Sequence, residues 1–532
     1  MKKICTSFFL LILLFSCSKK GETPSNYFYY NEISQIKSLD PAYARDLAHM
    51  WIVSQMFNTL VELDDSLNVV PSLAKRWDVD PSGKIYTFYL RNDVLFHQTP
   101  FHSDKELCSA HDVLFTFQRL ANPRTASPGR WVTVPIDTLP NGKLFIEIIN
   151  DSIIRFHLKK PFAPFLYYLT LPYTSIVPAK YVEKMGKDFA FWPIGTGPFY
   201  LKIWKPDQQL VLKKNPLYFE KDSAGNSLPY LEGISIRFIQ DKQVAFMEFI
   251  RGGFDFISGF DPMLNFILFD ENGFLKEKFK QKWYVQRFPF LNVEYLGMNV
   301  TQPPFDKKEV RQALNYAIDK EKLVFYVRHG VGIPAHGGIV PPALLPTGLS
   351  HNPYNLSKAK ELLKKAGYDE LHPFPNLTLY TTSSYAELAE FIQNELMKIS
   401  IPVQVEIVPT ATLREMMYQG KALFFRASWI ADYPDAGTYF SLFYSKNKTP
   451  YGPNYTFFEN RTYDALFEKS LTFYDESLKR QYYDQMLQIL NDEVPGIPLY
   501  YDESIRLVSR NIKGLTCNSF NLLKLKKVKK IL

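Results

Sequence analysis

Short stretches of this 532-residue chain alternate apolar and polar residues, and others repeat apolar residues at helical spacing. The alternation in Tyr27–Glu32 and in Ile85–Arg91 predicts two strands, the second of them half-buried. Apolar residues three and four positions apart predict a helix over Leu47–Leu60. A second helix is predicted over Ala110–Leu120, where Asn122-Pro123 ends it.

Three further stretches carry end or turn signals. Asp306 and Glu309 have the spacing of a capping box at the start of a helix. That helix has one apolar face, made of Val310, Ala313, Leu314, Ala317 and Ile318. Ser357 is predicted to start another helix, and Gly367 to end it in the C′ position. Gly195-Thr-Gly-Pro198 predicts a turn that feeds a strand, since glycine permits positive φ and proline fixes the exit. No Gly-Lys-Ser/Thr follows it, so the stretch is not a phosphate loop.

The length of the chain predicts two or three domains, because single cores stop growing near about 250–300 residues. With 46% hydrophobic and 22% charged residues, the composition is that of a soluble globular protein. Aromatic residues make up 16% of the chain, and its 33 tyrosines suit binding clefts as well as cores. A net charge of +8 is mild for this length, and no nucleic-acid footprint is present. The basic tail Lys524–Leu532 predicts a solvated final strand or, alternatively, attraction to a membrane surface.

The N-terminus has the features of an export signal. Lys2 and Lys3 precede the apolar run Phe8–Phe15, which is too short to span a bilayer. Leu14-Phe-Ser-Cys17 resembles a bacterial lipobox, in which the cysteine is acylated and becomes the mature N-terminus. A plain secretory signal with an incidental cysteine is the alternative. Cys108 and Cys517 remain in the mature chain, so the fold does not depend on a disulfide framework.

The stretch Arg426-Ala-Ser-Trp-Ile-Ala-Asp-Tyr-Pro-Asp435 is the first candidate for a ligand site. Asp432 stands at the end of an apolar run beside an aromatic residue, and Arg426 precedes it by six residues. The acid could bind a cation and the arginine an anion, so the pair suits a zwitterion such as a peptide. A structural salt bridge under an ordinary core strand is the alternative interpretation of the same residues.

No catalytic signature occurs in the sequence, and no cofactor is expected. Gly-x-Ser-x-Gly and His-Glu-x-x-His are both absent. Cys108-x-x-His111, with His97 and His102 upstream, is the best case for a metal site. No second Cys-x-x-Cys half completes a zinc tetrad, so we expect no metal there. The protein is predicted not to be an enzyme.

The chain resembles the extracellular solute-binding proteins of peptide-type ABC importers through motifs that follow one another in the family's order and spacing. These motifs cover nearly the whole mature chain: Ser38–Pro41, Pro71–Trp77, Tyr86–Arg91, Ala110–Leu120, Pro193–Tyr200, Trp204–Pro206, Leu212–Tyr218, Leu296–Asn299, Phe305–Asp319, Ser357–Tyr368 and Trp429–Tyr433. Each motif alone is weak evidence, whereas the ordered set is strong evidence.

The resemblance implies a two-lobed α/β clamp of the periplasmic-binding-protein type (type II, cluster C), with an extra α+β domain inserted in the first lobe. Matching landmarks place lobe I in residues 25–57, 189–290 and 500–532, the extra domain in 58–188, and lobe II in 291–499. Hinges would lie near Phe290 and Tyr500. Residues 1–16 would be the lipoprotein signal peptide, and 17–24 a lipidated tether.

The resemblance also implies roles for individual residues. Asp432 would receive the α-ammonium of a peptide, Trp429 would pack beside it, and Ser428 and Ile430 would offer backbone groups to the extended ligand. Arg426 matches an arginine that some members direct at the ligand's carboxylate. Trp131 would be a cleft aromatic from the extra domain, with core packing the equal alternative. The sequence departs from the family where Met417 replaces a basic residue and Arg45 lies in a region where a family acid approaches the ligand.

The function that this resemblance implies is capture of di- or oligopeptides and delivery to the transmembrane subunits of an ABC permease. The protein would be a monomer, exported and held at the membrane by the lipid on Cys17. In a second hypothesis, the same fold binds a murein peptide, a metal complex, haem or another non-standard ligand. A secreted hydrolase is the third and least favoured alternative, since the sequence offers no nucleophile–base pair.

Overall fold

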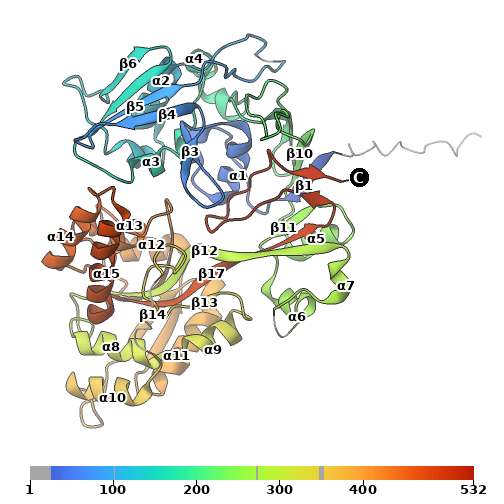
Figure 1. Ribbon diagram of the computed structural model, residues 1–532. Coiled ribbons are helices and arrows are strands. Elements are labelled where there is room, and N and C mark those ends of the chain that lie inside the picture. The colour runs from blue at the N-terminus through green and yellow to red at the C-terminus, as the bar shows by residue number, and fades with distance from the viewer. Residues whose placement is uncertain (1–25, 101, 271–272, 347–352, 532) are drawn as a thin grey trace, which may run out of the picture.

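The computed structural model describes residues 26–100, 102–270, 273–346 and 353–531, so the predicted signal peptide and Cys17 lie outside the described residues. The chain forms two α/β lobes that share one mixed sheet of eleven strands (Figure 1). Across the sheet the strands are β15 (Val403–Ile407), β14 (Leu377–Thr381), β16 (Phe424–Ile430), β12 (Trp283–Met298), β17 (Gly496–Ser509), β11 (Phe256–Ser258), β1 (Tyr27–Asn31), β10 (Gly233–Arg237), β9 (Gln209–Lys214) and β8 (Phe199–Lys205). β13 (Ile333–Pro334) pairs with β17 beside this path. The fold is the predicted α/β clamp.

Two long strands, β12 and β17, run from one lobe into the other (Figure 1). They pair antiparallel from Trp283 to Pro289 and again from Val293 to Gly297, and the register shifts between these segments. The interruption lies beside the predicted crossing near Phe290. The sheet is therefore continuous across the lobes but loses its regular pairing between them.

The residues from 58 to 188 contain a separate antiparallel sheet in the order β4 (Ala74–Val79), β5 (Ile85–Leu90), β7 (Ile153–His157) and β6 (Ile146–Asn150). The hairpin β2 (Val61–Leu63) and β3 (Val69–Pro71) precedes it. The predicted alternation in β5 is confirmed, because every second side chain is buried. The predicted helix is α2 (Ala110–Ala121), capped by Ser109 and Asp112. The shorter helices are α3 (Phe165–Tyr168) and α4 (Ala179–Met185).

In lobe I, helix α1 (Leu47–Met56) ends earlier than the apolar spacing predicts. Phe57 is already extended, and the Gly197 N–H donates to Met56 O at 2.9 Å. A Cβ at Gly197 would lie 2.6 Å from Phe57 N. Gly195-Thr-Gly-Pro198 does lead into β8, but its glycines are needed for this close approach and not for a positive φ. The other lobe I helices are α5 (Lys242–Ile250), α6 (Asn265–Leu268) and α7 (Glu277–Lys280).

Lobe II carries most of the remaining helices: α8 (Lys308–Ala317), α9 (Lys320–Lys322), α10 (Leu356–Lys365), α11 (Ala386–Met397), α12 (Thr410–Tyr418), α13 (Gly437–Phe440), α14 (Arg461–Ser470) and α15 (Glu476–Glu493). The predicted apolar face of α8 is buried. Its capping box is absent, since Lys307 is the N-cap and makes no side-chain cap. Asn355 caps α10 two residues before the predicted Ser357, and Gly367 has the expected positive φ.

The C-terminal segment packs back onto lobe I. The buried guanidinium of Arg506 donates to Asn521 Oδ1 at 2.6 Å and lies over the rings of Trp51, Phe256 and Phe288. The tail lysines are held internally as well, since Lys526 pairs with Glu62 at 2.9 Å and Lys530 with Asp255 at 2.9 Å. These pairs count against the membrane-surface interpretation of the tail, and only β18 (Ile512–Lys513) and β19 (Lys529–Lys530) are strands there. Within the described ranges, no helix combines the length and apolar character needed to cross a membrane.

Candidate ligand-binding site

Asp432 lies just beyond the end of β16, in lobe II. Its side chain is open to solvent and makes no ion pair with any described residue. Many protein atoms nevertheless crowd the carboxylate, and this desolvation raises its pKa to about 6, while the Thr438 hydroxyl opposes the rise. An unpaired, partly desolvated carboxylate gains from a cation that brings its own hydrogen-bond donors.

Four tyrosines surround Asp432 and feel its charge. Tyr168 and Tyr173 belong to the extra domain, whereas Tyr433 and Tyr439 belong to lobe II. Burial raises the pKa of each phenol, and the Asp432 carboxylate raises it further. Amphipathic rings from two parts of the chain therefore lie near the acid, and such rings suit an organic ammonium group.

The loop that carries Asp432 is fixed by a second acid. Asp435 is buried, forms an ion pair with Lys479 of α15, and accepts hydrogen bonds from Tyr483 Oη at 2.5 Å and Gly437 N at 2.7 Å. The Ala431 N–H donates to Leu291 O of β12 at 2.9 Å. Asp432 is thereby held in place before any ligand arrives. The sequence placed Asp435 in the candidate stretch but gave no indication of Lys479 as its partner.

Strand β16 offers an open edge beside this acid. It pairs with β12 along its whole length, from Phe424 opposite Met298 to Ile430 opposite Asn292. On its other edge β14 pairs only with Phe424 and Phe425. In the described part of the sheet, the edge from Arg426 onward has no strand partner, which leaves room for an extended peptide.

The side chains of this edge fit the expected arrangement. Ser428 and Ile430 are exposed, and Trp429 is half-buried against the lobe II core. The Trp429 indole N–H donates to Thr438 Oγ1 at 3.2 Å, and that hydroxyl also receives the Asp432 N–H at 3.4 Å. Thr438 therefore fixes the tryptophan and the acid relative to each other.

Arg426 is engaged within the protein. Its guanidinium donates to Glu294 Oε2 of β12 at 2.6 Å and stacks on Tyr385, 3.2 Å from the ring centroid. Burial raises the pKa of Glu294, and Arg426 counteracts this rise. The structural salt bridge considered for this stretch thus exists, but it joins Arg426 to Glu294 and not to Asp432. The one charged residue in the segment Val293–Met298 of β12, Glu294, was the sequence signal that a buried cation lies nearby.

A second ion pair lies close to the strand interruption. Arg328 donates to Asp502 Oδ1 at 2.9 Å, and Asn292 Nδ2 donates to Asp502 Oδ2 at 2.5 Å. The guanidinium lies 4.8 Å from the ring centroid of Tyr500. Polar groups of β12 and β17 therefore tie the two strands together where their ladder is broken.

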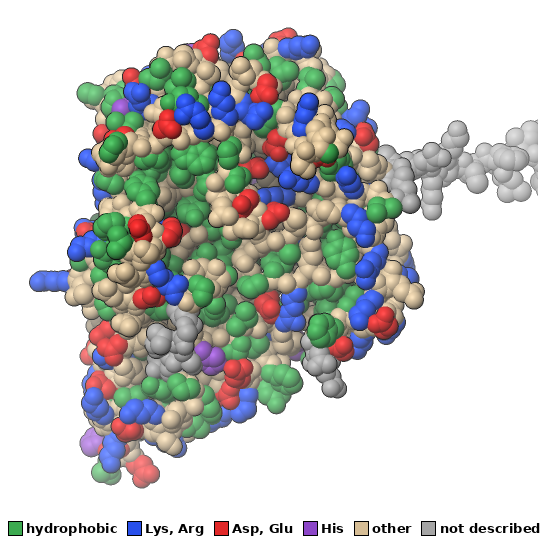
Figure 2. Space-filling view, in the orientation of Figure 1, with side chains coloured by type: hydrophobic (Ala, Val, Ile, Leu, Met, Phe, Trp, Pro, Cys, Tyr) green, Lys and Arg blue, Asp and Glu red, His purple; other side chains and the backbone are tan. Residues whose placement is uncertain are grey.

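Aromatic contacts connect the extra domain with lobe II. Trp131 packs edge-on against Tyr168 with ring centroids 4.8 Å apart, and Tyr168 packs against Tyr433 at 5.2 Å. Trp131 is half-buried in this small cluster, one ring removed from the Asp432 loop. Nearby, Tyr86 Oη lies 2.7 Å from Tyr474 Oη, and Ala163 N donates to Leu471 O at 2.8 Å. Apolar side chains gather in the band between the lobes in Figure 2.

Lobe I contributes a cavity of about 350 Å³ at the carboxyl ends of the parallel strands β1 and β11. Ligands of α/β sheets commonly bind at such strand ends. Its lining includes polar side chains from five segments: Asn31, Ser34, Asp46, Lys242, Ser258 and Asn521. Lobe I, which does not carry Asp432, therefore contributes polar groups of its own.

The histidines considered as metal ligands are separate. His97 is buried between Gly195 and Gly197, with its Nε2 2.9 Å from Gly197 O, and burial lowers its pKa to about 4. His102 packs against Tyr181, and exposed His111 lies near Asp151. Across the described ranges, no three His, Cys, Asp or Glu side chains converge in a way that could hold a metal ion.

A two-lobed clamp whose lobes share two strands, with an unpaired acid on one side of the cleft, defines a ligand-binding protein. The sequence matches the bacterial extracellular solute-binding proteins, family 5, over residues 68–451, and the chain belongs to this family. It is a solute-binding protein of the peptide-type ABC transport class, and family members are extracellular binding proteins and not enzymes.

Individual relatives are similar along nearly their whole length. The glutathione-binding protein GsiB of Escherichia coli (strain K12) is 28% identical over 489 residues, which cover 90% of each chain. The di/tripeptide-binding protein 1 of Pseudomonas aeruginosa is 28% identical over 484 residues, 88% of this chain and 87% of its own. The solved structure of DppA from Helicobacter pylori in complex with the peptide STSA has a TM-score of 0.78 at 27% identity, covering 95% of this chain and 98% of that one.

Proposed function

We propose that this protein captures di- and oligopeptides between its lobes and delivers them to an ABC peptide permease. The observation that carries this proposal is Asp432, an unpaired carboxylate beside the open edge of β16. The ligand's α-ammonium pairs with Asp432, and its main chain pairs with the backbone of Ser428 and Ile430. Main-chain pairing ignores side-chain identity, so such a site tolerates many sequences.

In the proposed closed state, residues from both sides of the clamp contact the ligand. Tyr168 and Tyr173 of the extra domain cover the ammonium end, and Trp131 supports Tyr168 from behind. We place the hinges at the predicted crossings near Phe290 and Tyr500, with the lobes and extra domain divided as the sequence predicts. A ligand that contacts both sides stabilises the closed arrangement by its differential affinity for it.

Arg426 receives the ligand's carboxylate in this proposal only if Glu294 gives up its pair, because Glu294 holds the guanidinium. The ammonium end therefore dominates recognition. A charge-assisted hydrogen bond contributes about 1.5–3 kcal/mol, which corresponds to about ten- to a hundredfold in affinity.

Calorimetry with free-amine and N-acetylated peptides of two to five residues tests the proposal. Glutathione belongs in the panel because relatives are named for it. Free-amine peptides should bind about ten- to a hundredfold more tightly than their acetylated forms, and Asp432→Asn should remove this preference. Glu370→Gln, an exposed acid just after α10, is the matched control and should change nothing. Equal binding of acetylated and free peptides would disprove the role of Asp432.

We infer that the protein is exported and anchored through a lipid on Cys17, as a monomer. Cys17→Ser should move it from the membrane fraction to the soluble fraction, and light scattering should give the mass of one chain. Cells that lack the protein should lose uptake of a labelled peptide. The wild-type protein should restore uptake, and Asp432→Asn should not. If Asp432→Asn restored uptake, peptide transport would not depend on this site.

A further inference from the structure

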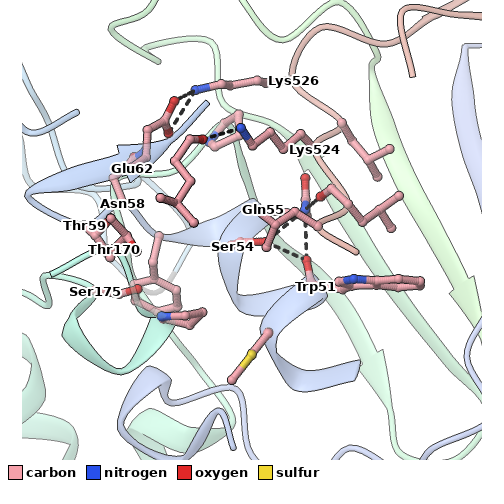
Figure 3. Close-up of a pocket in the computed structure, with 18 of the residues that line it drawn as sticks. Trp51, Ser54, Gln55, Asn58, Thr59, Glu62, Thr170, Ser175, Lys524 and Lys526 are labelled. Carbon is pink, nitrogen blue, oxygen red and sulfur yellow. Dashed lines mark hydrogen bonds and ion pairs between the residues drawn. The ribbon is translucent and has the colours of Figure 1, made fainter. Parts of the chain in front are cut away.

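A second cavity lies where helix α1 and the C-terminal segment of lobe I meet residues of the 58–188 segment. Helix α1 forms one wall, the segment from Thr170 to Ser175 the opposite wall, and the C-terminal segment from Phe520 to Lys526 closes it. Figure 3 shows Trp51, Ser54 and Gln55 facing Asn58, Thr59, Thr170 and Ser175 across the space, with Glu62, Lys524 and Lys526 along one rim. Its volume is about 120 Å³. Ser54 is exposed, so the cavity connects with solvent.

The lining is mostly apolar and its charges are neutralised. Apolar side chains come from all three walls: Met50, Phe57, Leu171, Phe520, Leu522 and Leu525. Lys526 pairs with Glu62 at 2.9 Å and with Glu220 at 2.8 Å, and Lys524 pairs with Asp65 at 3.5 Å. An ion entering the cavity would lose its hydration without gaining a free counter-charge. A neutral ligand is therefore favoured.

Two polar atoms in the lining, each on a largely buried side chain, make no hydrogen bond with the described residues. The Gln55 amide nitrogen donates to Trp51 O at 2.9 Å and to Leu523 O at 2.7 Å, which fixes the orientation of the amide. Its oxygen, on a side chain only 3% exposed, accepts no hydrogen bond from the described residues. The Ser175 hydroxyl, on a residue 2% exposed, likewise makes none within the described chain. Both atoms line the cavity without a protein partner, so they are available to a ligand that supplies a donor.

We propose that this cavity binds a neutral, single-ring group that carries a hydroxyl, of the size and chemistry of phenol. An apolar cavity of about 150 Å³ in another protein holds benzene, so a volume near 120 Å³ suits one ring that projects partly from the mouth. The hydroxyl donates to Gln55 Oε1 or exchanges a hydrogen bond with Ser175. Alcohols and phenols both carry a hydroxyl that can donate such a hydrogen bond. A phenol is favoured because its flat ring can pack against the wall that contains Trp51.

Two segments that line the cavity also approach the surroundings of Asp432. Ser175 follows Tyr173 by two residues, and Tyr173 feels the charge of Asp432. Phe520 lines the cavity and packs against the lobe II core that contains Ala431 and Tyr439. The hydroxylated ring thus comes either from a free small molecule or from a tyrosine side chain of a bound peptide. The second source rests on the proposed function, whereas the first does not.

Ligand-observed NMR titration at pH 7 with phenol and toluene tests the cavity without any peptide. Phenol should bind the wild-type protein more tightly than toluene, and Ser175→Ala should weaken phenol binding about two- to tenfold. Ser175→Leu fills the cavity and should abolish binding of both probes. Because Ser175 is buried, Ser54→Trp at the exposed mouth provides an independent block. The proposal fails if phenol does not bind, or if it binds Ser175→Leu and Ser54→Trp as it binds the wild type.

A second arm uses peptides that differ only by tyrosine or phenylalanine. If the ring is a ligand side chain, the tyrosine peptide should bind more tightly, phenol should compete with it, and Ser175→Ala should remove the difference. If phenol binds and the two peptides bind alike without competition, the cavity serves a free small molecule. If no peptide binds while phenol does, the proposed function fails and the cavity site stands.

Discussion

The charge of Asp432 should make peptide binding depend on pH, with a magnitude that follows from its surroundings. The pKa of this carboxyl is raised to about 6 in the free protein, chiefly by desolvation. The ammonium of a ligand favours the ionised carboxylate, so the complex has a lower pKa than the free protein. Binding must therefore weaken as the pH falls through 6, since protonated Asp432 must first lose its proton.

The expected change is about tenfold between pH 7 and pH 5. At pH 7 about nine-tenths of the free protein is ionised, and at pH 5 about one-tenth is, given a pKa near 6. Above about pH 8 the peptide's own α-ammonium deprotonates, so affinity should be greatest between these values. Near pH 6 binding should release about half a proton per complex.

Calorimetry in two buffers of different ionisation enthalpy measures both the affinity and the released proton. The N-acetylated peptide and the Asp432→Asn variant are the controls, and both should give flat profiles between pH 5 and pH 7. A tenfold loss that persists in Asp432→Asn would assign the titration to another group. A flat profile for the wild type would refute the desolvated, unpaired state of Asp432.

Three substitutions test two buried ion pairs and one close backbone contact by denaturation with urea or heat. Lys479→Met leaves Asp435 buried without its cation and should lower the free energy of unfolding by about 3–5 kcal/mol, and adding Asp435→Asn should recover part of the loss. Arg426→Met should lower the free energy of unfolding most at alkaline pH, where Glu294 is ionised. The loss should shrink as the pH falls, because burial raises the pKa of Glu294 to about 8 and the carboxyl then takes up a proton. Gly197→Ala should lower the melting temperature, since its Cβ would lie 2.6 Å from Phe57 N; an unchanged temperature would show that the end of α1 can shift.

Local patterns predicted the elements whose burial follows from their own residues. The alternation in Ile85–Leu90 and the apolar face of α8 needed no knowledge of distant segments. Asp432 was accessible to prediction because a family motif surrounds it and because Tyr433-Pro434 ends the strand. The end of α1 was not, because the backbone that stops it comes from Gly195–Gly197, some 140 residues further along the chain.

Partners that meet only in the folded chain were also beyond the sequence. Arg426 and Glu294 are separated by 132 residues, and Lys479 and Asp435 by 44. A charged residue in an apolar strand signals that a partner exists but does not say which one. The cavity beside α1 gave no signal, since its walls come from three segments that are each apolar for ordinary reasons.

The two long strands have a mechanical consequence for how the clamp works. Because β12 and β17 pass through both lobes side by side, the lobes cannot separate as two bodies on loose tethers. Between Pro289 and Val293 the pairing of β12 with β17 is interrupted while Asn292 still pairs with β16, so in the proposed closure this is where the two strands can twist relative to each other. If a peptide is held by one lobe as proposed, the shared strands restrict the ways in which the other lobe can approach it. The second set of contacts forms as an intramolecular step, at an effective concentration that the sheet itself sets.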